Sequence, residues 1–124
     1  MAWATSTDVV TRLAGYVTIS ASGTRPTTAD VAAWITDHEA TLKGAMSEGG
    51  WSLTQTDADA LAYLEDLVVS GGAGQVLKTR MRSMGSATKV DDRGTEYREH
   101  WKAQLQAIRE GRNVIPGGTK VTGG

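Results

Sequence analysis

The sequence predicts an all-α protein, a small bundle of four to five helices with a short extended N-terminal segment and an extended C-terminal arm. Apolar residues recur at spacings of three and four, while Thr-x-x-Asp patterns and glycines mark where these stretches begin and end. The chain has 124 residues, 40% of them hydrophobic, which is enough for one core. It contains no cysteine, and this excludes disulfide bonds and cysteine-based metal sites.

The N-terminal region is predicted to hold a short helix and then an extended stretch. The helix begins at Ser6 or Thr7, where a hydroxyl can accept hydrogen bonds from the free amides ahead of Asp8, and it ends at Gly15. Residues 16–20 read Tyr-Val-Thr-Ile-Ser, and such β-branched and aromatic residues favour an extended segment or short strand.

The clearest predicted helix begins at Thr27, because Thr27 with Asp30 nearly matches a capping box. Its end is predicted at the glycine pair of residues 49–50. The apolar face of this helix contains Val31, Trp34, Ile35, His38, Leu42, Ala45 and Met46. We interpret His38 as a packing residue, since it lies on this apolar face without other potential metal ligands.

Thr54 with Asp57 repeats the capping pattern and predicts the start of the next helix. The predicted buried stripe is Ala58, Leu61, Leu64, Leu67 and Val68. Glu65 and Asp66 carry the wrong charge for the C-terminal end of a helix dipole, so the helix is expected to continue beyond them. We therefore predict two helices, joined by a hinge at the Gly-Gly-Ala-Gly sequence of residues 71–74.

The C-terminal part is predicted to contain a loop, one more helix and a tail. The loop spans residues 85–94, Thr95 caps the helix, and Gly111 ends it. Residues 1–111 would form a helical domain, and residues 112–124 an arm that cannot build a core of its own. Across the bundle, the predicted core anchors are Trp34, Ile35, Leu61, Leu64, Tyr97, Trp101 and Leu105.

The residues give little support for catalysis. His38 and His100, the two histidines, fall on different predicted helices, and adjacent acid pairs diverge on a helix. Lys78 lies too far beyond the glycines of residues 71–74 for a phosphate-binding loop. We expect no enzyme activity, no cofactor, no metal ion and no membrane segment.

Opposite charges gather in the two parts of the chain. Residues 1–74 carry three basic and nine acidic side chains, whereas residues 75–124 carry ten basic and five acidic ones. These charges could simply cover solvated helix faces, or the two parts could meet within one subunit or between neighbouring subunits of an assembly.

Several motifs follow one another in a definite order along the chain. A short helix and an extended segment precede Thr-x-x-Asp-Val-x-x-Trp-Ile-x-Asp-x-Glu at residues 27–39. Then come Gly-Gly-Trp at 49–51, Gly-Gly-Ala-Gly at 71–74, Gly-Thr-Glu-Tyr at 94–97 and Ile-Arg-Glu-Gly at 108–111. This order, over nearly the whole chain, resembles that of the head–tail adaptor proteins, also called head completion or connector proteins, of long-tailed bacteriophages and gene transfer particles.

This resemblance implies a small helical protein, made in the host cytoplasm, that forms a ring of commonly twelve subunits beneath the portal of the virion. The ring extends the DNA channel without sequence-specific DNA binding, and it docks the stopper or tail completion protein. The portal-binding arm would then comprise Arg109, Arg112, Val114, Ile115, Lys120 and Val121. The candidate channel-facing acids are Asp57, Asp59, Glu65 and Asp66.

A small helical DNA-binding or packaging protein is the alternative. Its phosphate contacts would come from basic residues in the second part of the chain, and its affinity would fall steeply with salt. These residues are Lys78, Arg80, Arg82, Lys89 and Arg93.

Overall fold

The computed structural model describes residues 3–14, 19, 26–84 and 89–121, with the side chains of 80–93 excepted. The helices in these ranges are α1 (Ser6–Arg12), α2 (Thr28–Glu48), α3 (Ala58–Met84) and α4 (Lys89–Arg109). The all-α class is therefore confirmed. Of the predicted extended segment at residues 16–20, only Ile19 is described, and it is buried.

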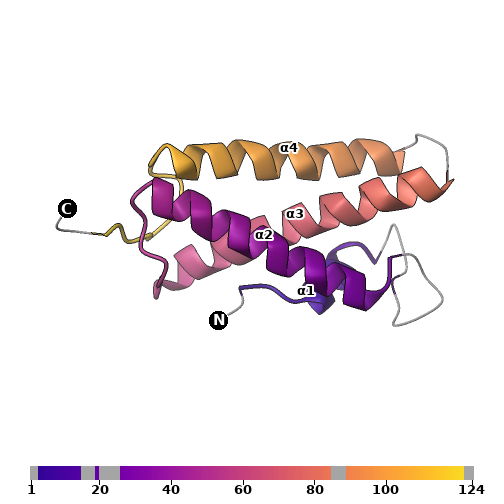
Figure 1. The fold of residues 1–124 in the computed structure, drawn as a ribbon, viewed down its shortest axis with the longest axis horizontal. Helices are drawn as coiled ribbons and strands as arrows, with labels where there is room; N and C mark the ends of the chain where they lie inside the picture. The colour runs from indigo at the N-terminus through magenta and orange to yellow at the C-terminus, as the bar shows by residue number, and fades with distance from the viewer. Residues whose placement is uncertain (1–2, 15–18, 20–25, 85–88, 122–124) are drawn as a thin grey trace.

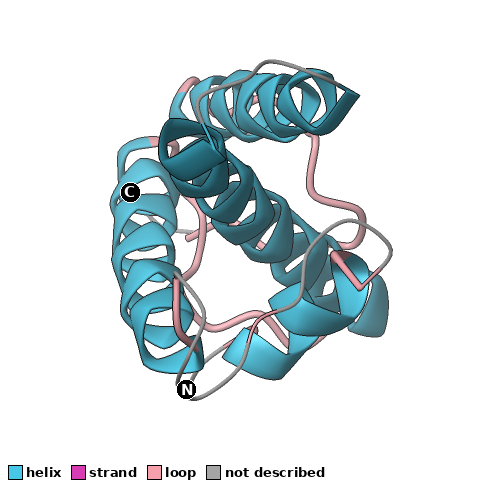
Figure 2. Cartoon of the chain, turned by 90° about the vertical axis from the view of Figure 1, so that its right-hand side faces the viewer, coloured by secondary structure: helices cyan, strands magenta, loops and turns pink. Residues whose placement is uncertain are grey.

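The three long helices run along the length of the molecule, with α3 packed against both α2 and α4 (Figure 1). The short α1 lies at one side of the bundle, where it contacts α2 and α3. Viewed from one end, the helices cross one another at an angle, and loops join their ends (Figure 2).

The core forms where the apolar faces of α2, α3 and α4 meet. Of the predicted face of α2, five side chains are buried, and Trp34 and His38 are half-buried at its edge. The fully buried large side chains of the bundle include Val31, Leu42, Met46, Leu64, Leu67, Val68, Val76, Leu77 and Ile108.

Two capping boxes open the first two helices. In α1, which begins at Ser6 as predicted, the capping residue is Thr5, whose amide donates to Asp8 Oδ2 at 2.8 Å. In α2, the amide of Asp30 donates to Thr27 Oγ1 at 3.3 Å and Thr27 N donates to Asp30 Oδ2 at 3.0 Å, which confirms the predicted box.

The start of α3 differs from the prediction. Asp57 is the capping residue, because its Oδ1 accepts hydrogen bonds from Asp59 N at 2.9 Å and Ala60 N at 3.2 Å. Thr54 lies outside the helix, and its amide donates to Ser52 Oγ. The acid expected three residues after the capping threonine is thus the cap itself.

The predicted hinge at residues 71–74 is wrong, since α3 is one continuous helix. Its glycines are buried at close contacts with three other helices. A methyl group at Gly71 would lie 2.5 Å from Cδ2 of His38, and one at Gly74 would lie 2.8 Å from Cγ of Arg98. These glycines allow close helix packing, and Glu65 and Asp66 lie in the first half of a long helix, far from its C-terminal end.

The predicted loop at residues 85–94 is wrong over residues 89–94, which form the first turns of α4; residues 85–88 lie outside the described part. Thr95 is consequently a position inside the helix and not its cap. Gly94 is buried against α3, where a methyl group would lie 3.0 Å from Leu77 Cβ. Close packing again explains the glycine.

Most of the predicted core anchors are confirmed. Ile35, Leu64 and Leu105 are buried, while Trp34, Tyr97 and Trp101 are half-buried and pack against the core. Leu61 is the error, because 36% of it is exposed. The buried face of α3 passes through Ala60, Leu64, Leu67 and Val68, which places Leu61 on a neighbouring, solvent-facing side of the helix.

Candidate functional site

The C-terminal segment folds back on the bundle instead of leaving it. We call residues 112–121 the strap and residues 49–57, which join α2 to α3, the connector. Gly111 has a φ of 77°, a conformation that glycine adopts readily, and the chain reverses there. Ile115 is only 5% exposed and belongs to the core cluster. Over the described residues, the predicted arm is therefore packed on the bundle and is not free, while the predicted domain boundary at residue 112 stays a prediction.

The strap pairs with the connector through the backbone. Ser52 N donates to Thr119 O at 2.9 Å, and Val121 N donates to Gly50 O at 2.8 Å. These two bonds flank an antiparallel bridge between Trp51 and Lys120. The end of the strap is thus held like a strand of two or three residues.

Gln55 strengthens this pairing from the connector side. Its Nε2 donates to Thr119 O at 2.9 Å, and its Oε1 accepts from Thr119 N at 2.8 Å. The side-chain amide therefore acts as a neighbouring strand would. Because Gln55 is 6% exposed, loss of these bonds would leave buried polar groups without partners.

Trp51 fills the space beneath the strap. It is 3% exposed, and the Nζ of Lys120 lies 4.9 Å from its ring centroid, within range for a cation–π contact. The same Nζ donates to Gly111 O at 2.5 Å. Lys120 therefore stabilises its own subunit.

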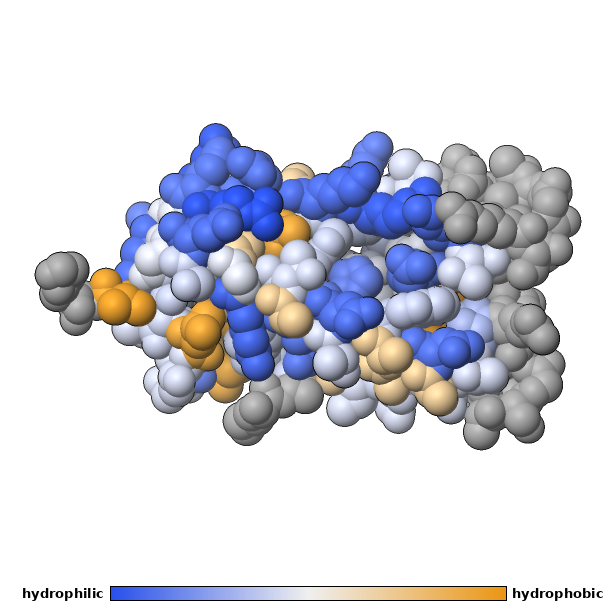
Figure 3. All heavy atoms as spheres, in the orientation of Figure 1, coloured by the Kyte–Doolittle hydropathy of each residue, from blue (hydrophilic) through white to orange (hydrophobic). Residues whose placement is uncertain are grey.

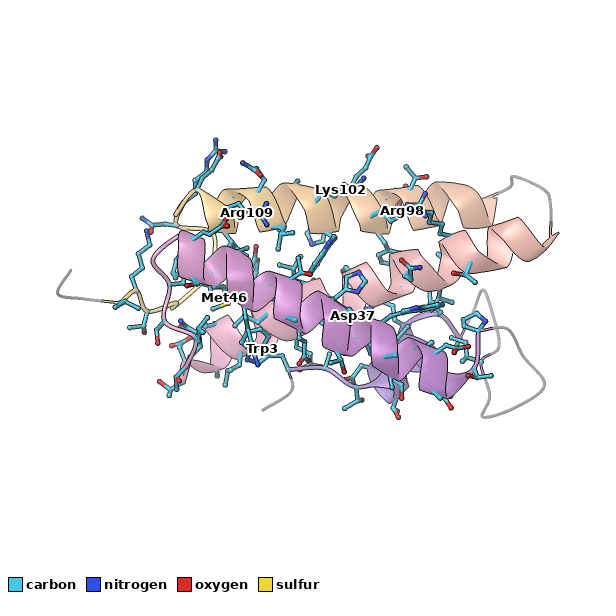
Figure 4. The ribbon with its side chains drawn as sticks, in the orientation of Figure 1. Trp3, Asp37, Met46, Arg98, Lys102 and Arg109 are labelled. Carbon is cyan, nitrogen blue, oxygen red and sulfur yellow. The ribbon has the colours of Figure 1, made fainter. Side chains whose placement is uncertain are left out.

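The six residues of the predicted portal-binding arm do not form one surface. Arg109 pairs with Glu48 of α2 at 2.6 Å, and Arg112 pairs with Glu110 at 3.0 Å. Val114 is half-buried, whereas Val121 is 66% exposed. Figure 4 shows Arg109 at the end of α4 that lies beside the end of α2. Of the apolar members, Val121 is the one available to a partner.

An open groove of about 480 Å³ lies between the N-terminal residues, α2, the connector and α3. It is lined by Trp3, Lys43, Leu53, Thr54, Gln55, Thr56 and Leu61. Leu53 and Leu61 are 49% and 36% exposed, which makes this an apolar surface accessible from outside. Trp3 lies on the side of α2 away from α4 (Figure 4).

The wall of the groove formed by Trp3 is fixed by α2. Glu39 Oε1 accepts hydrogen bonds from Trp3 N at 2.8 Å and Ala4 N at 3.0 Å. The Lys43 Nζ lies 5.4 Å from the Trp3 ring centroid. Glu39 is 7% exposed and was not among the predicted site residues, although its position four residues after Ile35 on the apolar face was a usable signal.

The four candidate channel-facing acids have different surroundings. Asp57 caps α3, and Asp66 forms a 2.8 Å ion pair with Arg12 of α1. Asp59 and Glu65 are exposed on the first half of α3. The structure does not bring the four together, and their channel-facing role remains a prediction.

His38 packs as predicted. Its Nδ1 lies 2.7 Å from Trp34 O, and its ring meets that of Trp101 edge-on with a centroid distance of 4.8 Å. Among the described residues, no three histidine, aspartate or glutamate side chains gather as a metal site would require. No helix in these ranges is both long and apolar enough to cross a bilayer.

The surroundings of Tyr63 in α3 predict that the protein loses stability at alkaline pH. Its hydroxyl donates to Gln104 of α4, and burial together with the nearby charge of Asp66 raises its pKa from 10.0 to about 12. The unfolded chain thus loses this proton first, so the stabilising effect present below pH 10 disappears as the pH rises towards 12. Thermal unfolding between pH 8 and 12 should show a smaller alkaline loss for Tyr63→Phe than for the wild type.

The Asp66→Asn variant serves as the control for this prediction. Removing its charge should lower the pKa of Tyr63, because a phenolate beside a neutral amide is less disfavoured. Absorbance titration of the tyrosines measures this directly. An alkaline stability loss that is identical in the wild type and in Tyr63→Phe would contradict the assignment.

Comparison with known proteins yields no match to a family model, to a curated protein or to a solved structure.

Proposed function

We propose that this chain is a structural adaptor, which forms a homo-oligomeric ring between the portal and the tail or stopper of a phage particle and extends its DNA channel. The position of the uncovered apolar side chains carries the proposal. Among the described residues, the exposed large hydrophobic ones are Leu53, Leu61 and Val121, on the connector, the start of α3 and the end of the strap. Such clustering supports a protein-binding surface.

The distribution of surface character supports the same function. Apolar surface gathers towards the end of the molecule where the strap lies, whereas the side formed by α4 is strongly hydrophilic (Figure 3). A ring contact joins two different faces of each copy, so it needs surfaces of unlike character on one subunit. The unequal charges of residues 1–74 and 75–124 meet that need. Of these charges, Glu48 and Arg109 already pair with each other within the chain.

Electron microscopy of the protein mixed with purified portal rings tests this function. We expect a second ring of defined symmetry on the portal, coaxial with its channel. The adaptor proposal fails if the protein does not bind the portal, or if it binds as isolated copies without a ring.

A DNA-binding or packaging protein is a second candidate, favoured by one observation. The end of α3 and the start of α4 lie side by side at the end of the bundle opposite the strap (Figure 1). The backbone there carries Lys78, Arg80, Arg82, Lys89 and Arg93. Titration with duplex DNA at rising salt tests it: steeply weakening affinity supports DNA binding, and no binding at low salt removes this candidate.

A further inference from the structure

We propose that the end of the strap of one copy docks in the groove of a second copy, with Val121 seated between Leu53 and Leu61. This inference rests on the proposed homo-oligomeric ring and deepens it, because it names the surfaces that join neighbouring subunits. Each copy supplies one projecting apolar residue and one receiving groove.

The groove is suited to an apolar segment of a few residues. Its volume of about 480 Å³ falls within the range of about 300–1,000 Å³ that is typical of ligand pockets. Leu53 and Leu61 expose apolar surface to solvent within it, and Trp3 adds an aromatic wall. A docked valine would remove this surface from water.

Val121 cannot fill the groove of its own chain while the strap stays paired. The strap runs antiparallel to the connector, with Thr119 beside Ser52 and Val121 beside Gly50. Each further residue of the strap towards the C-terminus therefore lies farther from Leu53. The side chain of Val121 remains 66% exposed, so a second copy is the source of the groove that can cover it.

Opposite charges lie near the two surfaces, although Lys43 in the lining of the groove has the same sign as Lys120. Lys120 directly precedes Val121, while exposed Glu65 lies one helical turn beyond Leu61 on the same face of α3. The groove belongs to the acidic part of the chain and the strap to the basic part. Within the groove, Lys43 can donate hydrogen bonds to the carbonyl groups of an entering segment.

The resulting contact joins two different surfaces, so it can repeat from copy to copy. Such a heterologous contact closes into a ring or extends as a filament, depending on the rotation between neighbours. Each contact is small, and closing a ring lets many weak contacts act together.

Sedimentation velocity of the full chain over a range of concentrations tests the contact. We expect the wild type to form species larger than a monomer, and Val121→Asp or Leu61→Gln to weaken this association by about tenfold or more. Val121→Ile should retain it. Gln106→Glu, which adds a negative charge to the exposed face of α4, is the control and should associate like the wild type.

Mixing the two defective variants separates docking from general loss of structure. Val121→Asp retains a groove and Leu61→Gln retains a strap end, so an equimolar mixture should form pairs although neither variant associates alone. Both positions are exposed, and we expect thermal midpoints close to that of the wild type. Larger assemblies should be absent, since each pair lacks a second complementary contact.

Cross-linking gives an independent readout, because the natural chain contains no cysteine. Under mild oxidation, Val121→Cys chains mixed with Leu61→Cys chains should form a disulfide-linked heterodimer, whereas Val121→Cys mixed with Gln106→Cys should not. A wild type that remains monomeric at every concentration, or a Val121→Asp variant that associates like the wild type, overturns the proposal. A ring of Val121→Asp subunits on the portal would overturn the proposed docking contact and leave the adaptor function intact.

Discussion

Gly71→Ala is expected to lower the free energy of unfolding by about 2 kcal/mol. Alanine favours a helix over glycine by about 1 kcal/mol, so the loss must come from packing. The new methyl group would lie 2.5 Å from Cδ2 of His38 and 3.1 Å from Cδ2 of Trp101. The ring of His38 cannot retreat easily, because its Nδ1 bonds to the Trp34 carbonyl and the ring packs edge-on against Trp101.

Gly44→Ala is the matched control on a different helix. Gly44 lies inside α2 and is exposed, and a methyl group there would have no neighbour within 4 Å. The substitution should raise the free energy of unfolding by about 0.5–1 kcal/mol through helix propensity alone. Chemical denaturation measures both variants. If Gly71→Ala also stabilises the protein, the glycines of α3 provide flexibility and not close packing.

A double-mutant cycle with His38→Ala identifies the contact responsible. Removing the imidazole ring makes room for a methyl group at position 71, so Gly71→Ala should destabilise the His38→Ala background less than the wild type. Directly contacting residues show interaction energies of about 0.5–3 kcal/mol. Additive effects would mean that the methyl group is accommodated elsewhere.

These glycines also show why the helix boundaries could be predicted only in part. The period of apolar residues gave the class and most of the core, since Ile35, Leu64 and Leu105 need only their own helix to reveal a face. A glycine such as Gly71 is compatible with a hinge, a helix end or a close contact. The choice depends on whether another helix, here carrying His38, lies against it.

The candidate site was harder to predict, because it depends on long-range pairing. Gln55 meets Thr119 across 64 positions of sequence, and neither residue belongs to a periodic pattern. Ile115 looked like part of a tail without a core, although the core it joins is supplied by the rest of the bundle. A sequence pattern describes what a segment can bury but not which distant surface receives it.

Ile115→Ala should lower the free energy of unfolding by about 3 kcal/mol, the largest effect we expect from a single substitution in the strap. The side chain is 5% exposed and belongs to the same cluster as Trp51 and Ile108. Removing three methyl or methylene groups leaves a cavity that the strap cannot close, since Gln55 holds it only a few residues further on. Urea denaturation followed by tryptophan fluorescence measures the change.

Val121→Ala provides the comparison within the same segment. Val121 is 66% exposed, so its truncation should change the free energy of unfolding by no more than about 0.5 kcal/mol. If residues 112–121 were a free arm, neither substitution would change the free energy of unfolding. If the strap is part of the fold, Ile115→Ala lowers it and Val121→Ala leaves it unchanged. Equal stability of Ile115→Ala and the wild type would therefore support a free arm. Deletion of residues 112–124 would then leave the helical bundle as stable as before.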